Sequence, residues 1–193
     1  MQELLASSTV RFFARDWSYL GDRDSLGAEI ELATGIEPGE DAEKASVARK
    51  MSWLSHRQTT REEDMVYCML GLFGVNMPLL YGEGPKAFHC LQEEIVRQTA
   101  DLTIFCWWHS TEETGDFHPL LAPRPSTFRA AGGFFLRPKS RNIMVHTWSI
   151  TTRGLSLSLP TIRTLSGAFI RLDDVQHKDT LPHESWVFLH VSS

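Results

Sequence analysis

The chain has no block of basic residues and no long hydrophobic run. Its 19 lysines and arginines are outnumbered by 24 aspartates and glutamates, which gives a net charge of −5. We therefore expect no nucleic acid partner, because such proteins need clustered positive charge. No apolar stretch reaches the roughly 18 to 20 residues that cross a bilayer, and residues 1–13 lack a basic segment followed by a long apolar one. We expect neither a membrane anchor nor an export signal.

Cysteine is scarce, and neither cysteine nor histidine occurs at the spacing of a metal site. The cysteines Cys68, Cys90 and Cys106 form an odd set without C-x-x-C spacing, which suits reduced thiols in the cytoplasm. The eight histidines show neither H-x-x-x-H spacing nor a mixed Cys and His pattern. We expect a cytoplasmic protein without a metal or a cofactor.

Hydrophobic residues make up 42% of the chain, which is enough for a globular core. Between residues 42 and 98 they recur at helical spacing, and we predict helices over 42–55 and 85–98. Their inward-facing residues are Val47, Ala48, Met51 and Ser55 in the first helix and Phe88, Leu91 and Ile95 in the second. The six tryptophans could anchor interactions, but at this density we expect most of them to be partly buried.

A further helix is predicted between these two, over residues 60–74. Thr60 and Glu63 have the spacing of a capping box, in which the threonine oxygen accepts a backbone N–H and the glutamate reaches back to the cap. Gly71 and Gly74 are predicted to end the helix. Its core face is formed by Met65, Cys68, Met69 and Leu72.

Two polar motifs flank this helix. The first contains Arg61, Glu62 and Asp64, which form either a functional cluster or a solvated helix start, and capping accounts for the spacing more directly. The second contains Tyr81, Gly82 and Gly84, whose free N–H groups before a helix could hold an anion. A tight turn that positions the next helix is favoured here, because neither a clear preceding strand nor phosphate-loop spacing is present.

Beyond residue 101 the helical periodicity ends and β-prone runs follow. The first is the apolar LTIFCWW at 102–108, and a short strand is also predicted near the start of the chain, in STVRFF. Four later runs alternate like strands, namely IMVHTWSI, GLSLSLP, GAFIRLDDV and SWVFLHV. Arg153 and Gly154 predict a hairpin turn between the first two. We expect an α+β fold.

The helical region carries a family resemblance. The run TTREEDMVYCMLGLFGVNMPLLYGEGPKAFHCLQEEI closely resembles the C-terminal half of the fungal heterokaryon incompatibility (HET) domain, and the opening QELLASSTVRFFARDWSYLG resembles the middle of that domain. HPLLAPRPSTF and WSITTRGLSLSLP resemble the β-rich region that often follows it. The resemblance implies a partial HET domain over 1–105, as the helical C-terminal half of a TIR-like α/β fold, and a β-rich region of unknown function over 106–193.

This resemblance implies a function in fungal non-self recognition, because HET domains trigger programmed cell death when incompatible cells fuse. In the family, about half of the domain precedes the Q-E-L-L-A motif, which here occupies residues 2–6. We expect that half to be missing, which would leave strand edges unpaired. Such edges favour association with protein partners or self-association, and we expect no catalysis.

The alternative implied by the resemblance is cleavage of NAD. HET domains are remotely similar to TIR domains, some of which hydrolyse NAD with a glutamate in a W-C-x-x-E-L type motif. The ionised carboxylate suits that role because it places negative charge beside the developing ribosyl cation. Glu3 is the matching position, and NAD would be the substrate.

Overall fold

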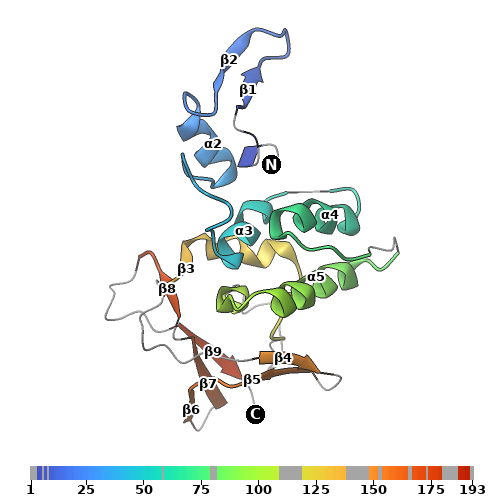
Figure 1. Cartoon of the computed structure of the whole chain (residues 1–193), viewed down its shortest axis with the longest axis vertical. Helices are drawn as coiled ribbons and strands as arrows, with labels where there is room; N and C mark the ends of the chain where they lie inside the picture. Colours follow the sequence, from blue (N-terminus) through green and yellow to red (C-terminus); the bar gives the residue numbers. More distant parts are fainter. Residues whose placement is uncertain are drawn as a thin grey trace.

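The structure is a computed structural model, and it describes residues 4–5, 7, 9–57, 59–78, 82–108, 119–137, 148–151, 154–164, 167–172, 174–179 and 187–191. From one end of the molecule to the other it places a β-hairpin with the helix that follows it, three further helices and several small sheets (Figure 1). Helices and antiparallel strands occur together, which confirms the expected α+β class.

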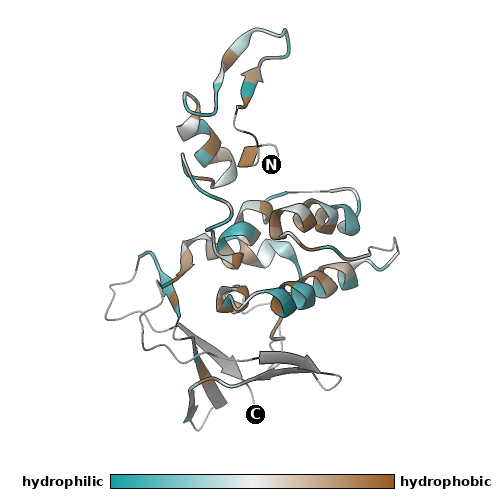
Figure 2. Ribbon diagram, in the orientation of Figure 1, coloured by the Kyte–Doolittle hydropathy of each residue, from teal (hydrophilic) through white to brown (hydrophobic). Residues whose placement is uncertain are grey.

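The N-terminal arm is a hairpin followed by a helix. Strands β1 (Arg11–Phe13) and β2 (Tyr19–Asp22) pair antiparallel, and α2 (Gly27–Thr34) follows them. The strand predicted in STVRFF is confirmed. The hairpin projects away from the three later helices in Figure 1, although Figure 2 shows hydrophobic residues on its strands.

The three predicted helices are confirmed as α3 (Val47–Leu54), α4 (Glu62–Phe73) and α5 (Pro85–Gln98). Helix α3 starts later than predicted, because Ser46 is its N-cap and accepts a hydrogen bond from the Arg49 N–H at 3.2 Å. Gly74 ends α4 with a φ of 65°, a conformation that glycine adopts without strain. Gly71 lies inside the helix, so its predicted role as a terminator is wrong.

The predicted β-prone run at 102–108 begins as a 3₁₀ helix, η1 (Leu102–Phe105). Asp101 caps it: its Oδ1 accepts hydrogen bonds from the N–H of Thr103 at 2.8 Å and from the hydroxyl of Thr103 at 2.6 Å. Local bonds of this kind stabilise a helical turn in competition with a strand. They override the β propensity of the apolar residues here.

The hydrophobic core is centred on α3, α4 and α5. Met51, Met69 and Leu91 are 0% exposed, and the inward-facing residues predicted for α3 and α5 are all buried. On α4 two of the four predicted core residues, Met65 and Met69, are buried, and the other two are half-buried. The same core includes Leu102, Phe128 and Val175. It therefore contains residues on both sides of residue 105, and the division into 1–105 and 106–193 stays a prediction.

The C-terminal part contains short helices and small antiparallel sheets. The 3₁₀ helices η2 (Pro125–Phe128) and η3 (Ala131–Gly133) lead into β3 (Phe134–Leu136), which pairs with β8 (Val175–His177). Strands β4 (Trp148–Thr151) and β5 (Gly154–Leu157) form the predicted hairpin, whose turn residues 152 and 153 lie outside the described residues. Strands β6 (Thr161–Thr164), β7 (Gly167–Leu172) and β9 (Val187–Val191) form a sheet with β7 in the centre. All strand pairs of the described residues are antiparallel, and the TIR-like part of the fold expectation stays a prediction.

Candidate functional site

Glu63 of α4 holds the glycine bend that precedes α5. Its Oε1 accepts hydrogen bonds from the backbone N–H groups of Gly82 and Gly84, both at 3.0 Å, and the residue is buried. Gly82 and Gly84 have φ values of 102° and 53°, a region that favours glycine. The anion bound by these N–H groups is therefore the protein's own carboxylate, as the favoured tight-turn interpretation of this motif implies.

The predicted capping box is wrong. Arg61 is the N-cap of α4, and no side chain caps the helix. The hydroxyl of Thr59 donates to the Arg61 carbonyl oxygen at 2.6 Å, while Glu63 binds the glycine bend. Glu63 gains two N–H donors there, whereas a capping box would offer it one.

Glu63 is held in its ionised form by these backbone groups. Its own N–H and those of Gly84 and Gly82 hold the pKa of the Glu63 carboxyl below its usual range. Because the folded-state pKa is depressed, the carboxylate stabilises the fold at pH values above its unfolded-state pKa. That stabilisation is lost as the pH falls through the folded-state pKa.

We expect Glu63→Gln to lower the urea midpoint of unfolding at pH 7, because glutamine lacks the charge that strengthens both N–H bonds. The difference from the parent protein should shrink as the pH falls below the ordinary glutamate pKa, about 4.3, and through the depressed folded-state pKa of Glu63, where the parent carboxyl becomes protonated. Glu83→Gln is the matched control, since Glu83 is exposed on the same bend. Equal effects of the two substitutions, or a difference that does not change with pH, would contradict this assignment.

Of the other predicted site residues, Arg61 is exposed and Asp64 is half-buried at the start of α4, and both make interactions within the chain. Glu3 and Tyr81 lie outside the described residues, and so does the side chain of Glu62. The structure thus joins Gly82 and Gly84 to Glu63. The interaction roles of the rest, and the catalytic role of Glu3, stay predictions.

A buried polar network at the start of α3 was missed by the sequence analysis. Asp101 Oδ2 accepts a hydrogen bond from the Val47 N–H at 2.8 Å, and Thr103 Oγ1 accepts one from the Ala48 N–H at 3.0 Å. The Ser46 hydroxyl donates to the carbonyl oxygen of Phe134 at 2.6 Å. The first N–H groups of a helix have no partner within the helix. Here residues distant in sequence supply those partners, so the network is structural.

The buried Gln92 was missed as well. Its Oε1 accepts from the Ala122 N–H, and its Nε2 donates to the Ala122 carbonyl oxygen, both at 2.8 Å. Gln92 is 0% exposed. It therefore links the segment around residue 122 to α5 through two hydrogen bonds, and its role is structural.

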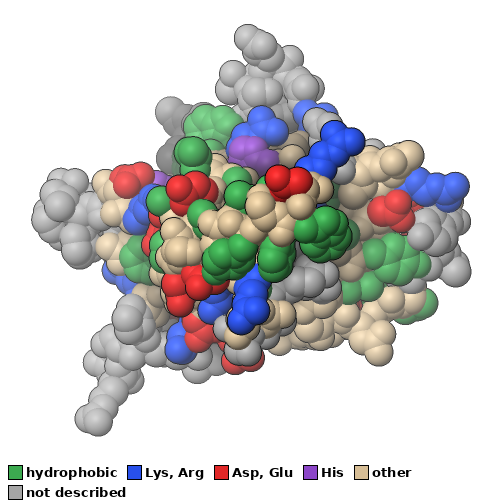
Figure 3. Space-filling model, turned by 90° about the horizontal axis from the view of Figure 1, so that it is seen from above, with side chains coloured by type: hydrophobic (Ala, Val, Ile, Leu, Met, Phe, Trp, Pro, Cys, Tyr) green, Lys and Arg blue, Asp and Glu red, His purple; other side chains and the backbone are tan. Residues whose placement is uncertain are grey.

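Exposed aromatic side chains gather on the β1–β2 hairpin. Phe13, Trp17 and Tyr19 are 47%, 82% and 58% exposed, and the Phe13 ring centroid lies 6.2 Å from that of Trp17 and 5.8 Å from that of Tyr19. We call these three residues the aromatic cluster. From the hairpin end of the molecule, hydrophobic side chains lie beside acidic and basic groups near the middle of the visible face (Figure 3). Exposed aromatic groups of this kind are typical of protein interfaces.

The tryptophans do not share one environment. Trp53 is 1% exposed, as expected for a core residue, whereas Trp17 and Trp108 are 82% and 72% exposed. We expect most tryptophans to be partly buried, and these last two are exceptions to that expectation. Composition alone does not distinguish them, because the exposure of Trp17 follows from the projection of the hairpin.

Two of the cysteines, Cys90 and Cys106, are poorly suited to act as nucleophiles. All three are free. Burial raises the pKa of the Cys106 thiol and, to a lesser degree, that of the Cys90 thiol, so both remain protonated near neutral pH. Across the described ranges, no group of three or more His, Cys, Asp or Glu side chains could hold a metal ion. In that same part of the chain, no helix combines the length and apolar character that a membrane crossing needs.

The sequence is similar to a fungal vegetative incompatibility protein. Over 112 residues it is 45% identical to the vegetative incompatibility protein HET-E-1 of Podospora anserina, a match that covers 54% of this chain and 8% of that protein. The chain therefore spans a small part of this relative. No family model and no solved structure matches the chain. The similarity to HET-E-1 confirms the predicted relationship of this chain to the fungal heterokaryon incompatibility proteins.

Proposed function

We propose that this chain takes part in the non-self recognition that underlies heterokaryon incompatibility in fungi, and that it contributes to programmed cell death through protein association without catalysis. The observation that carries this proposal is the 45% identity to a vegetative incompatibility protein. The match covers 8% of that relative, so the action of the whole protein is part of the proposal.

The aromatic cluster on the β1–β2 hairpin is the proposed association surface. A lone two-stranded hairpin is marginally stable in water, and the outer edges of β1 and β2 have no strand partner among the described residues. Unpaired edges pair readily with another chain. Burial of Phe13, Trp17 and Tyr19 in such a contact would remove their exposed surface from water.

The partner we propose is a second copy of this chain. Within the hairpin, Arg11 of β1 lies opposite Asp22 of β2, so its two edges carry opposite charge. The β1 edge of one copy next to the β2 edge of another would again place an arginine beside an aspartate. Opposite charges across a strand pair are favourable, and like charges are not.

The proposal also includes location and domain organisation. Three free cysteines suit the reducing cytoplasm. We assign residues 1–105 to the helical C-terminal part of a TIR-like HET domain and 106–193 to the β-rich region that follows it.

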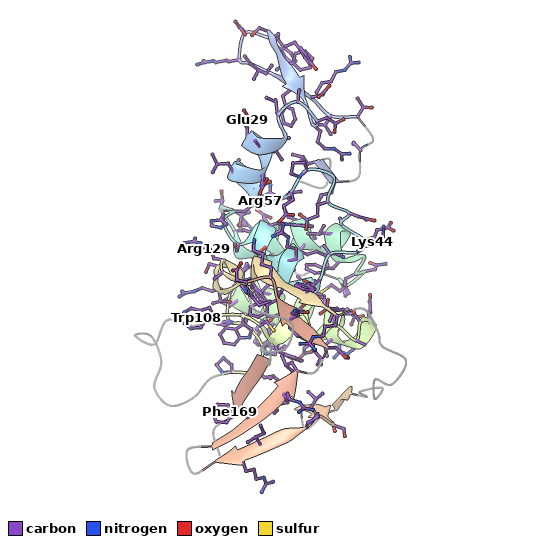
Figure 4. All side chains as sticks on the ribbon, turned by 90° about the vertical axis from the view of Figure 1, so that its left-hand side faces the viewer. Glu29, Lys44, Arg57, Trp108, Arg129 and Phe169 are labelled. Carbon is purple, nitrogen blue, oxygen red and sulfur yellow. The ribbon has the colours of Figure 1, made fainter. Side chains whose placement is uncertain are left out.

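Expression of the chain in a filamentous fungus tests this proposal. We expect the parent chain to reduce viability and Trp17→Ser to restore it, because serine removes the most exposed ring of the aromatic cluster. Trp108→Ser is the matched control, since Trp108 is also exposed but lies away from the hairpin, near the middle of the molecule (Figure 4). It should leave the effect on viability intact.

Two outcomes would contradict the proposal. The first is equal loss of the effect in both tryptophan variants. The second is release of nicotinamide from NAD by the purified chain together with loss of that release in Glu3→Ala, which would assign the function to NAD cleavage.

A further inference from the structure

A pocket with an apolar wall lies beside the contact between Glu63 and the glycine bend, which we call the Glu63 junction. Its volume is about 370 Å³, within the range of small-molecule sites. It lies between the segment that contains Ser55, Arg57 and Thr59, the first turns of α4 and α5, and residues 123–126. Its apolar wall is formed by Met65, Val66, Pro85, Phe88, Pro123 and Pro125.

Among the described residues that line this pocket, the charged groups all have one sign. They are Arg57 and Arg124, and Arg124 also makes an interaction within the chain. Arg57 is exposed and is labelled in Figure 4. Three hydroxyl groups also belong to the lining. Those of Ser55 and Thr59 already donate to backbone carbonyl oxygens, so Ser126 is the one that adds a donor for an anion. The pocket therefore combines an apolar body with a cationic, hydrogen-bonding rim.

A second pocket shows why this combination is selective. It has a volume of about 490 Å³ and contains Arg129 and Lys178, but Glu31 and Asp179 line it as well. Its mixed charges favour no single class of ligand. The two pockets share no lining residue, so an arginine of one serves as a control for the other.

We propose that the pocket of Arg57 and Arg124 binds a small amphipathic carboxylate. The apolar part of the ligand packs against Pro85, Pro123 and Pro125, which are exposed or half-buried on the lining. Its carboxylate accepts hydrogen bonds from the Arg57 guanidinium. An inorganic anion would leave the apolar wall unused, while a cation would be repelled by Arg57. This binding site is independent of the proposed function.

Decanoate is the probe, titrated by calorimetry into the full 193-residue chain. We expect saturable binding at one site and no binding of decyltrimethylammonium, which has the same tail and the opposite charge. Arg57→Ala should weaken decanoate binding roughly tenfold, because it removes a charge-assisted contact. Arg129→Ala removes an equally charged, exposed residue of the second pocket and should leave the affinity unchanged.

Ser126→Trp provides a second variant, since Ser126 is exposed on the lining and a large side chain there would fill the pocket. It should abolish decanoate binding while the circular dichroism spectrum stays unchanged. If Ser126→Trp fails to fold, the comparison of Arg57→Ala with Arg129→Ala decides the test. Absence of decanoate binding, equal binding of the cationic probe, or equal effects of Arg57→Ala and Arg129→Ala would each overturn the proposal.

Discussion

Replacing Gln92 with leucine is expected to lower the free energy of unfolding by about 3 kcal/mol, since each buried polar group left without a partner costs about 1–3 kcal/mol. Leucine is close to glutamine in size but cannot bond to the N–H and the carbonyl oxygen of Ala122. Both Gln92 and Ala122 are at most 1% exposed, so water does not replace the lost partner. Urea unfolding followed by circular dichroism measures the change.

Gln98→Leu is the control for this prediction. Gln98 lies on the same helix, is exposed, and bonds only to Glu94 at 2.7 Å among the described residues. Exposed substitutions of this kind change stability by about 0.5 kcal/mol or less. If Gln92→Leu proved no more destabilising than Gln98→Leu, the structural role of the Gln92–Ala122 pair would be refuted.

Asp101→Ala is expected to have an effect of similar size, about 3 kcal/mol, because three hydrogen bonds to a buried carboxylate are lost at once. The N–H groups of Val47 and Thr103 and the Thr103 hydroxyl would all lose their acceptor. Asp101 joins the start of α3 to η1, so both elements should loosen together. Hydrogen exchange should be accelerated most at Val47 and Thr103.

The matched control is Asp41→Ala. Asp41 is exposed, bonds to the Glu43 N–H at 2.9 Å and pairs with Lys44 at 2.8 Å, and surface contacts of this kind contribute little to stability. The loss of stability should therefore be far smaller than for Asp101→Ala. Unchanged exchange at Val47 in Asp101→Ala would contradict the proposed linkage between α3 and η1.

The helices could be predicted from sequence because their pattern is local. Within each helix the buried residues, such as Val47, Ala48 and Met51 of α3, recur at a spacing close to 3.6, and the pattern alone indicates which face is buried. The start of α3 could not be predicted in the same way. Its N–H groups bond to side chains 54 and 55 residues further along the chain, and no local rule reveals such partners.

The candidate site shows the same limit. The spacing of Thr60 and Glu63 predicted a local cap, but the partners of Glu63 are glycines 19 and 21 residues away. Sequence analysis singled out both Glu63 and the glycines Gly82 and Gly84, but it did not indicate that they are in contact. The pocket of Arg57 and Arg124 likewise draws its lining from four separate segments. Long-range contacts of this kind require the fold.

Sedimentation velocity of the purified chain over a range of concentrations tests most directly whether the aromatic hairpin is an association surface. We predict that the parent chain and Trp108→Ser form dimers or larger species as concentration rises, whereas Trp17→Ser remains monomeric under the same conditions. A parent chain that stays monomeric throughout, or a Trp17→Ser variant that associates as strongly as Trp108→Ser, would contradict the account.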